Sequence, residues 1–192
     1  MFNFFKKLKK RETTASDQWC RIAMEDATKR LVEKTDYSQM SVLEISGEKW
    51  KDFNFKSYKT LCYPDIDICK DKLDETFDLI IAEQVFEHLI YPHRAAINVH
   101  SMLNAGGYFL ITTPFLILYH PAPEDCSRWT ETGLKYFLEE AGFPVEHIQT
   151  GSWGNKSCTI ANLDSWIVYN QRKHSLENDA RFPIVVWALA KK

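Results

Sequence analysis

SVLEISGEKW, residues 41–50, starts as a short buried strand and ends in a turn. The strand is apolar except for Glu44, and Ser46-Gly47 breaks it where an open α/β sheet would pass into a helix. Ligands of such sheets lie beyond the carboxyl ends of the strands. A glycine lets the backbone pass close under a ligand because it has no Cβ atom. The stretch therefore predicts the ligand-binding edge of an α/β sheet, although Gly47 is its only glycine.

Length and charge limit the classes of function. The 192 residues, 45% of them hydrophobic, are enough for one substantial core and few for two. We expect a single domain over residues 17–192. The 24 basic and 26 acidic residues give a net charge of -2, which provides no general field to attract nucleic acid or an anionic membrane. The expected partner is a small molecule, and the sequence leaves the oligomeric state open.

The N-terminus differs from the rest of the chain. Residues 1–11, MFNFFKKLKKR, combine phenylalanines and a leucine with five lysines or arginines. Such a pattern suits a short amphipathic surface helix, a frayed basic tail or a lid on the domain. We favour the tail or lid and assign it residues 1–16.

The cysteines indicate a reducing compartment. The chain has five, an odd number, with no C-x-x-C pair, which favours packed thiols over a disulfide framework or a zinc site. A cytoplasmic location and no bound metal are therefore expected. The longest apolar stretches, around residues 107–119 and 182–190, are shorter than the ~20 residues of a membrane span, so no transmembrane helix is expected.

Apolar runs and helical patterns alternate along the rest of the chain. This alternation predicts a doubly wound, mostly parallel sheet of the α/β class. The last two strands have no helix of their own between them and predict a C-terminal antiparallel pair. Phe77 lies only fourteen positions after Tyr63, which is too short for the usual helix and strand, so one flank of the sheet is expected to be trimmed. The expected helices are 17–33, 85–88, 94–103 and 131–141; the further strands are 59–63, 77–82, 107–113, 145–150 and 183–190.

Four fragments, in this order and spacing, resemble the class I S-adenosylmethionine-dependent methyltransferases. The resemblance covers about residues 40 to 150 and implies a Rossmann-like fold, methyl transfer and S-adenosylmethionine as the donor. The strand pair at the end fits the reversed hairpin of that family. The fragments are VLEIS, FDLIIAEQVFEHL, LNAGGYFLITTP and RWTETGLKYFLEEAGF.

The chain departs from the family at its first motif, typically E/D-x-G-x-G-x-G. Glu44 is retained, whereas Glu48 and Trp50 stand at or near later glycine positions. A sulfonium nucleoside has no pyrophosphate that needs a row of backbone amides, so side chains can replace some of these contacts. Two hypotheses remain: an enzyme that methylates an O or N nucleophile of a small molecule, and an inactive methyltransferase-like scaffold or ligand-binding module.

The expected cofactor contacts follow the strand ends. The resemblance places Glu44 under the amino-acid or ribose part of the cofactor. Asp65 and Asp67, just after the second strand, either bind ribose or adenine or belong to a solvated turn. One residue of the pair Glu83-Gln84, which follows FDLIIA, should line the pocket. The predicted cofactor-binding residues are Glu44, Ser46, Gly47, Asp65, Asp67, Glu83 and Gln84.

The segment after the fourth strand, FLILYHPAPEDCSRWTE, places polar and aromatic residues at the same edge. His120 is the candidate general base, because neutral imidazole accepts a proton near pH 7; the alternative is that it only packs in the loop. Arg128 either clamps an acidic group of the substrate or pairs with Asp125 or Glu131. The predicted acceptor-binding residues are His88, Asp125, Arg128, Trp129 and Trp153.

Overall fold

The computed structural model describes residues 17–192, and the predicted N-terminal tail lies outside this part of the chain. Six strands form one sheet in the order β2-β1-β3-β4-β6-β5. The strands are β1 (Ser41–Ile45), β2 (Ser57–Leu61), β3 (Phe77–Glu83), β4 (Leu103–Pro114), β5 (Ile148–Trp153) and β6 (Val185–Lys191). The α-helices are α1 (Trp19–Glu33), α2 (Pro92–Ser101), α3 (Glu131–Glu140) and α4 (Lys156–Asn162).

The sheet is mixed in the way that the sequence predicts. β1 pairs in parallel with β2 and β3, and β3 pairs in parallel with β4. β6 runs antiparallel to both β4 and β5, which confirms the C-terminal antiparallel pair. β2 is an edge strand, and the described residues 62–76 that lead from it to β3 contain no helix or strand. The trimmed flank is thus confirmed.

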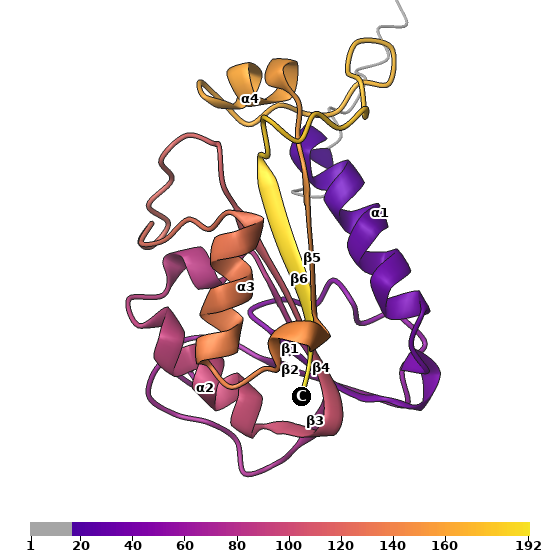
Figure 1. Cartoon of the computed structure of the whole chain (residues 1–192), viewed down its shortest axis with the longest axis vertical. Coiled ribbons are helices and arrows are strands. Elements are labelled where there is room, and N and C mark those ends of the chain that lie inside the picture. The colour runs from indigo at the N-terminus through magenta and orange to yellow at the C-terminus, as the bar shows by residue number, and fades with distance from the viewer. Residues whose placement is uncertain (1–16) are drawn as a thin grey trace, which may run out of the picture.

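Helices cover both faces of the sheet (Figure 1). Side chains of β3 alternate between two cores: Leu79 and Ile81 face α1, whereas Ile80 and Ala82 face α2 and α3. All four residues are at most 1% exposed. This near-continuous apolar strand is what burial on both faces requires. The first residues of α1, the segment after β4 and α4 lie at one end of the sheet. These three parts of the chain therefore lie around its carboxyl edge.

Several local predictions differ from the structure. The predicted helix 85–88 is a single 3₁₀ turn, Phe86–His88. The predicted strand 145–150 begins with another such turn and becomes β5 only at Ile148. α4 was not predicted; Asn155 caps it by accepting a hydrogen bond from the Cys158 backbone nitrogen at 2.9 Å. Among the described residues no helix is long and apolar enough to cross a membrane.

Candidate functional site

The ends of β1 and β3 share an unusual backbone feature. Ser46 follows β1 with φ 59°, and Gln84 follows β3 with φ 57°. Residues other than glycine seldom occupy this left-handed region, and those that do are concentrated at functional sites. The two strands are neighbours, with Ile45 opposite Ala82. Two strained residues therefore lie side by side at the carboxyl edge of the sheet.

Glu44 holds the turn that follows β1. Its side chain is buried, and its carboxylate accepts hydrogen bonds from the backbone nitrogens of Lys49 (3.1 Å) and Trp50 (2.9 Å) and from the Tyr58 hydroxyl (2.6 Å). The oxygens of Glu44 are thus bonded to the chain itself. This arrangement organises the turn with a side chain where the family's first motif uses glycines.

A charged cluster joins this turn to β3 and α1. Nζ of Lys49 lies 2.8 Å from Oε1 of Glu83 and 2.6 Å from Oε1 of Glu25. The other oxygen of Glu83 accepts a hydrogen bond from Nε1 of Trp50 at 2.9 Å. Burial raises the pKa of Glu25, although Lys49 opposes this rise. One cation and two carboxylates therefore meet beside the ends of β1 and β3.

The two aspartates after β2 have different surroundings. Asp67 accepts hydrogen bonds from the backbone nitrogen of Cys69 (3.0 Å) and pairs with Nζ of Lys70 (2.8 Å). The hydrogen bond from Lys70 holds the pKa of Asp67 below its usual value. Asp65 is exposed and makes no hydrogen bond or ion pair with any residue in 17–192. Asp67 thus organises the turn, and Asp65 is free to meet a ligand.

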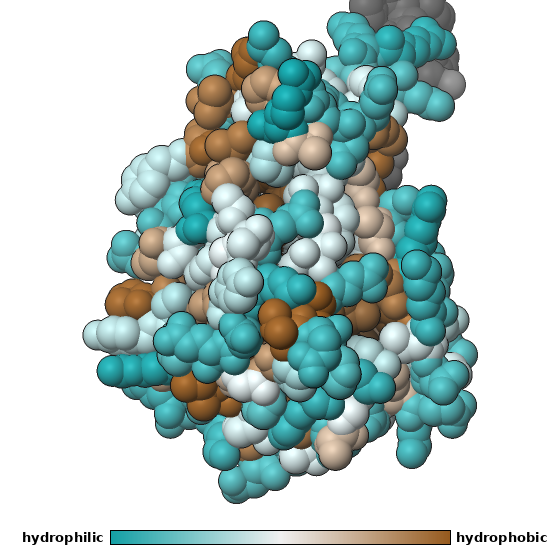
Figure 2. Space-filling view, viewed as in Figure 1, coloured by the Kyte–Doolittle hydropathy of each residue, from teal (hydrophilic) through white to brown (hydrophobic). Residues whose placement is uncertain are grey.

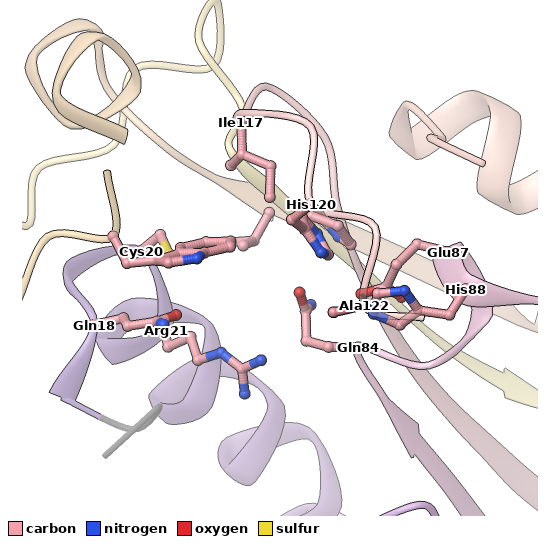
Figure 3. A pocket seen from close by; sticks show the side chains of 12 residues that line it. Gln18, Cys20, Arg21, Gln84, Glu87, His88, Ile117, His120 and Ala122 are labelled. Carbon is pink, nitrogen blue, oxygen red and sulfur yellow. Dashed lines mark ion pairs between the residues drawn. The ribbon is translucent and has the colours of Figure 1, made fainter. Parts of the chain in front are cut away.

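A cavity of about 240 Å³ opens beyond the ends of β3 and β4 (Figure 3). Gln84 lines it, between Arg21 on one side and Glu87 on the other in this view, and its side-chain nitrogen donates to Oγ1 of Thr112 at 3.1 Å. The start of α1 closes one side with Arg21, and the segment after β4 closes another. The lining residues are Gln18, Cys20, Arg21, Gln84, Glu87, His88, Pro114, Ile117, His120, Ala122, Trp166 and Val185.

Two histidines share one wall of the cavity. The rings of His88 and His120 meet edge to face, with centroids 5.1 Å apart. Nε2 of His120 is buried without a hydrogen-bond partner among the described residues. Burial lowers the pKa of His120, although the nearby Asp125 opposes this. His120 is therefore neutral at pH 7 and has a nitrogen available to the cavity.

Asp125 and Arg128 pair with each other instead of lining this cavity. Nη1 and Nη2 of Arg128 donate to the Asp125 carboxylate, which also accepts from the His120 backbone nitrogen at 2.9 Å. Burial opposes ionisation of Asp125, but these bonds outweigh it and hold its pKa below the usual value. The pair borders a more open hollow of about 300 Å³ next to the cavity. It fixes the loop that carries His120.

The two predicted tryptophans lie outside the cavity lining. Trp129 packs on Phe137 of α3, with ring centroids 5.0 Å apart. Trp153 is buried, and its indole nitrogen donates to the carbonyl of Leu176 at 3.0 Å. Both environments stabilise the surrounding loops. The tryptophan in the lining is instead Trp166, which the sequence did not single out.

Glu87 is the main site residue that was not predicted. Its side chain is fully buried in the cavity wall, and neither carboxylate oxygen has a hydrogen-bond partner among residues 17–192. Burial raises its pKa to about 7. Its backbone carbonyl accepts from the nitrogens of Cys126 (2.7 Å) and Ser127 (3.3 Å), so the loop after β4 folds over it. The only sequence signal was an acid between a core phenylalanine and a histidine.

Apolar side chains are exposed on α4 and on the segment that follows it. Figure 2 shows hydrophobic atoms gathered over α4 and the loop beside it. Ile160, Leu163 and Val168 are each more than 40% exposed, and Trp166 is 41% exposed while it also lines the cavity. Of these four residues, Trp166 reaches the cavity lining, to which Arg21, Glu87, His88 and His120 contribute the titratable groups.

Comparison with known proteins assigns this chain to a family. A model described as a methyltransferase domain matches residues 13–148, more than half of the chain. The chain belongs to this methyltransferase-domain family. It is therefore an enzyme of the methyl-transferring class. No curated protein matches it in sequence.

Solved structures share the fold of this methyltransferase. An S-adenosylmethionine-dependent methyltransferase from Mesorhizobium loti has a TM-score of 0.59 at 14% identity, covering 88% of this chain and 98% of that chain. One from Thermotoga maritima has 0.57 at 13% identity, covering 91% and 98%. One from Archaeoglobus fulgidus has 0.55 at 16% identity, covering 88% and 94%. These likenesses confirm the Rossmann-like methyltransferase fold.

The residues at the ends of β1, β2 and β3 fit S-adenosylmethionine. An amino-acid group needs a cation for its carboxylate and acids for its ammonium, and the cluster of Lys49, Glu25 and Glu83 has both. Exposed Ser46 leaves the turn accessible, and Asp65 has no partner among residues 17–192. No three His, Cys, Asp or Glu side chains in 17–192 are grouped to hold a metal ion.

Proposed function

We propose that this methyltransferase transfers the methyl group of S-adenosylmethionine to an oxygen or nitrogen atom of a small molecule bound in the cavity. The observation that carries the proposal is the position of Gln84. It follows the last residue of β3, beside the strained Ser46 turn, and it also lines the cavity. A methyl donor bound at the Ser46 turn and an acceptor bound in the cavity would both lie next to Gln84, so the methyl group would face the acceptor. A volume of about 240 Å³ favours a small acceptor group.

The donor side would be held by side chains more than by glycines. Ser46, Gly47, Lys49 and Glu83 surround the place for the amino-acid end, and Asp65 is placed for hydroxyl groups. Glu44 and Asp67 act indirectly, because their carboxylates organise the two turns. When bound, S-adenosylmethionine supplies a methyl group on a positively charged sulfur, so no protein nucleophile is needed. The protein contributes alignment and exclusion of water.

On the acceptor side, His120 would take the proton that an O–H or N–H nucleophile releases. Its neutral ring and unpaired Nε2 support this role. His88 would line the acceptor site with it, and the Asp125–Arg128 pair would hold the loop in place. Trp129 and Trp153 would stabilise the surrounding structure. All five cysteines are free thiols, which supports a cytoplasmic location.

Two linked measurements test the proposal. Calorimetric titration with S-adenosylmethionine and with S-adenosylhomocysteine should give saturable binding of one ligand per chain. Mass spectrometry of pooled small metabolites incubated with protein and S-adenosylmethionine should then show a product heavier by one methylene together with S-adenosylhomocysteine. Absence of both heat and thermal shift with either ligand would overturn the proposal and favour a scaffold that has lost donor binding.

A further inference from the structure

The carboxyl group of Glu87 forms part of the cavity wall, and no residue in 17–192 makes a hydrogen bond with it. The side chain is 0% exposed, and neither oxygen has a hydrogen-bond partner in residues 17–192. Buried polar atoms are hydrogen-bonded in the large majority of cases, so each exception calls for a physical explanation. Because Glu87 lines a cavity, the missing partner has room to be a bound molecule.

The charged neighbours do not neutralise this carboxyl group. Arg21 from α1 and Arg128 from the loop after β4 act on it electrostatically, and Asp125 opposes them. No lysine or arginine nitrogen of residues 17–192 lies within 4.0 Å of its oxygens. The nearest titratable nitrogen is Nε2 of His88, 3.6 Å from Oε1 of Glu87.

The tautomer of His88 matters for this contact. Nδ1 of His88 lies at hydrogen-bond distance from the backbone carbonyl of Glu124, which can only accept. Nδ1 therefore carries the hydrogen in the neutral ring, and Nε2 turns a lone pair toward Glu87. Neutral His88 thus gives the carboxylate no counter-charge. A cation from outside the chain would supply it.

We propose that Glu87 pairs with a basic amine carried by the methyl acceptor. The inference rests on the proposed function and narrows its acceptor to molecules that bear an ammonium group. An ammonium group has three donors and one positive charge, so it satisfies both oxygens and the charge of Glu87, whereas a hydroxyl group offers one donor and no charge. The aromatic wall formed by Trp166 also suits a cation.

The pairing has a defined pH dependence. Burial raises the pKa of Glu87 to about 7, so the carboxyl is neutral at pH 6 and largely ionised at pH 8. An alkylamine remains protonated across this range. Its affinity should therefore increase from pH 6 to pH 8. The titratable and charged groups around Glu87 are His88 beside it, Arg21 of α1, and Asp125 and Arg128 of the loop after β4.

Propylamine and propan-1-ol form a matched pair of probes, because they have similar size and differ in charge. Each is titrated into ¹⁵N-labelled protein saturated with S-adenosylhomocysteine, and shifts of the Gln84 and Ala122 amides report on the cavity. We expect saturable shifts with propylamine, affinity that rises from pH 6 to pH 8, and at least tenfold weaker effects with propan-1-ol. Glu87→Gln should remove the amine preference. Glu124→Gln, the same change at an exposed acid, should keep it.

Equal affinity for amine and alcohol, or unchanged amine affinity in folded Glu87→Gln, would overturn the proposal. Equal affinity for the amine and the alcohol is also what a Glu87 carboxylate already neutralised by His88 would give. Should Glu87→Gln not fold, Glu87→Asp keeps the charge and must retain amine preference at reduced affinity. Both probes are also titrated without S-adenosylhomocysteine. Amine preference there supports the Glu87 pairing even if the donor does not bind, so failure of the proposed function would be seen separately.

Discussion

Gly47 packs directly against the carboxylate of Glu44: a Cβ atom built on Gly47 would lie 2.4 Å from Oε1. No real Cβ atom tolerates such a contact, and the carboxylate cannot move without losing the bonds that hold the turn. The glycine is thus needed for packing within the turn as well as for access of a ligand.

We therefore predict that Gly47→Ala lowers stability and donor affinity together. Overpacking of this kind costs about 1–3 kcal/mol of unfolding free energy. Urea denaturation measures the first effect and titration with S-adenosylhomocysteine the second. An unchanged denaturation midpoint would show that the turn adapts freely and that Glu44 does not constrain it.

Lys49 is predicted to bind the carboxylate of the donor's amino-acid end. Lys49→Met should weaken S-adenosylhomocysteine binding by about 1.5–3 kcal/mol, the range for hydrogen bonds to charged groups. Methylthioadenosine lacks the amino-acid end, so its affinity should be nearly unchanged. Lys51→Met is the control, because Lys51 is exposed and its ammonium group pairs with Glu48 at 3.4 Å. Equal losses for both ligands would indicate a general disturbance of the turn.

His120→Ala is predicted to reduce turnover by ~10²- to 10⁴-fold, the contribution usual for a general base, while donor affinity stays nearly constant. The defect should shrink as pH rises, because an acceptor that ionises in solution no longer needs the base. Wild-type activity should decline only in acid, below the lowered pKa of His120. His147→Ala, at an exposed histidine, serves as the control. A pH-independent loss with a lower melting temperature would indicate a structural role.

Glu87 should make the protein less stable at neutral pH than it would be without this acid. Its pKa rises from 4.5 to about 7 on folding, so the folded state holds the proton more tightly. The unfolding free energy of the wild type therefore falls as pH increases from 4.5 to 7 and stays reduced above 7. Glu87→Gln cannot ionise and should be more stable at pH 8 by up to roughly 3 kcal/mol.

Thermal or urea unfolding at several pH values tests this difference. The two unfolding free energies should converge toward pH 4.5, where Glu87 is neutral in both states. Parallel curves for wild type and Glu87→Gln across pH 4.5–8 would mean that the buried carboxyl group is already paired in the folded protein.

The sheet was predictable because its central strands are buried on both faces and carry an unbroken apolar pattern, as in residues 77–82. The trimmed flank was predictable from the short connection between Tyr63 and Phe77 alone. α4 was missed because it has only seven residues, and its helical pattern depends on Asn155 capping and on packing of Cys158. Local sequence carries little of that signal.

The site was less predictable than the fold, because most of its geometry depends on contacts between distant parts of the chain. Polar residues at strand ends, such as Glu83 and Gln84, follow from topology. The role of Glu44 in holding its own turn depends on how residues 47–50 fold back, which spacing does not reveal. Glu87 becomes buried only because the loop after β4 folds over it, and α1 contributes Arg21 from a distant part of the chain.

The most direct test of donor and acceptor sites meeting at Gln84 is a crystal structure of the complex with S-adenosylhomocysteine. We predict that its amino-acid end lies at Lys49 and Glu83 and that its sulfur faces the cavity bordered by Gln84 and His120. A ligand whose sulfur points away from this cavity, or whose amino-acid end lies far from Lys49, would contradict the proposed site.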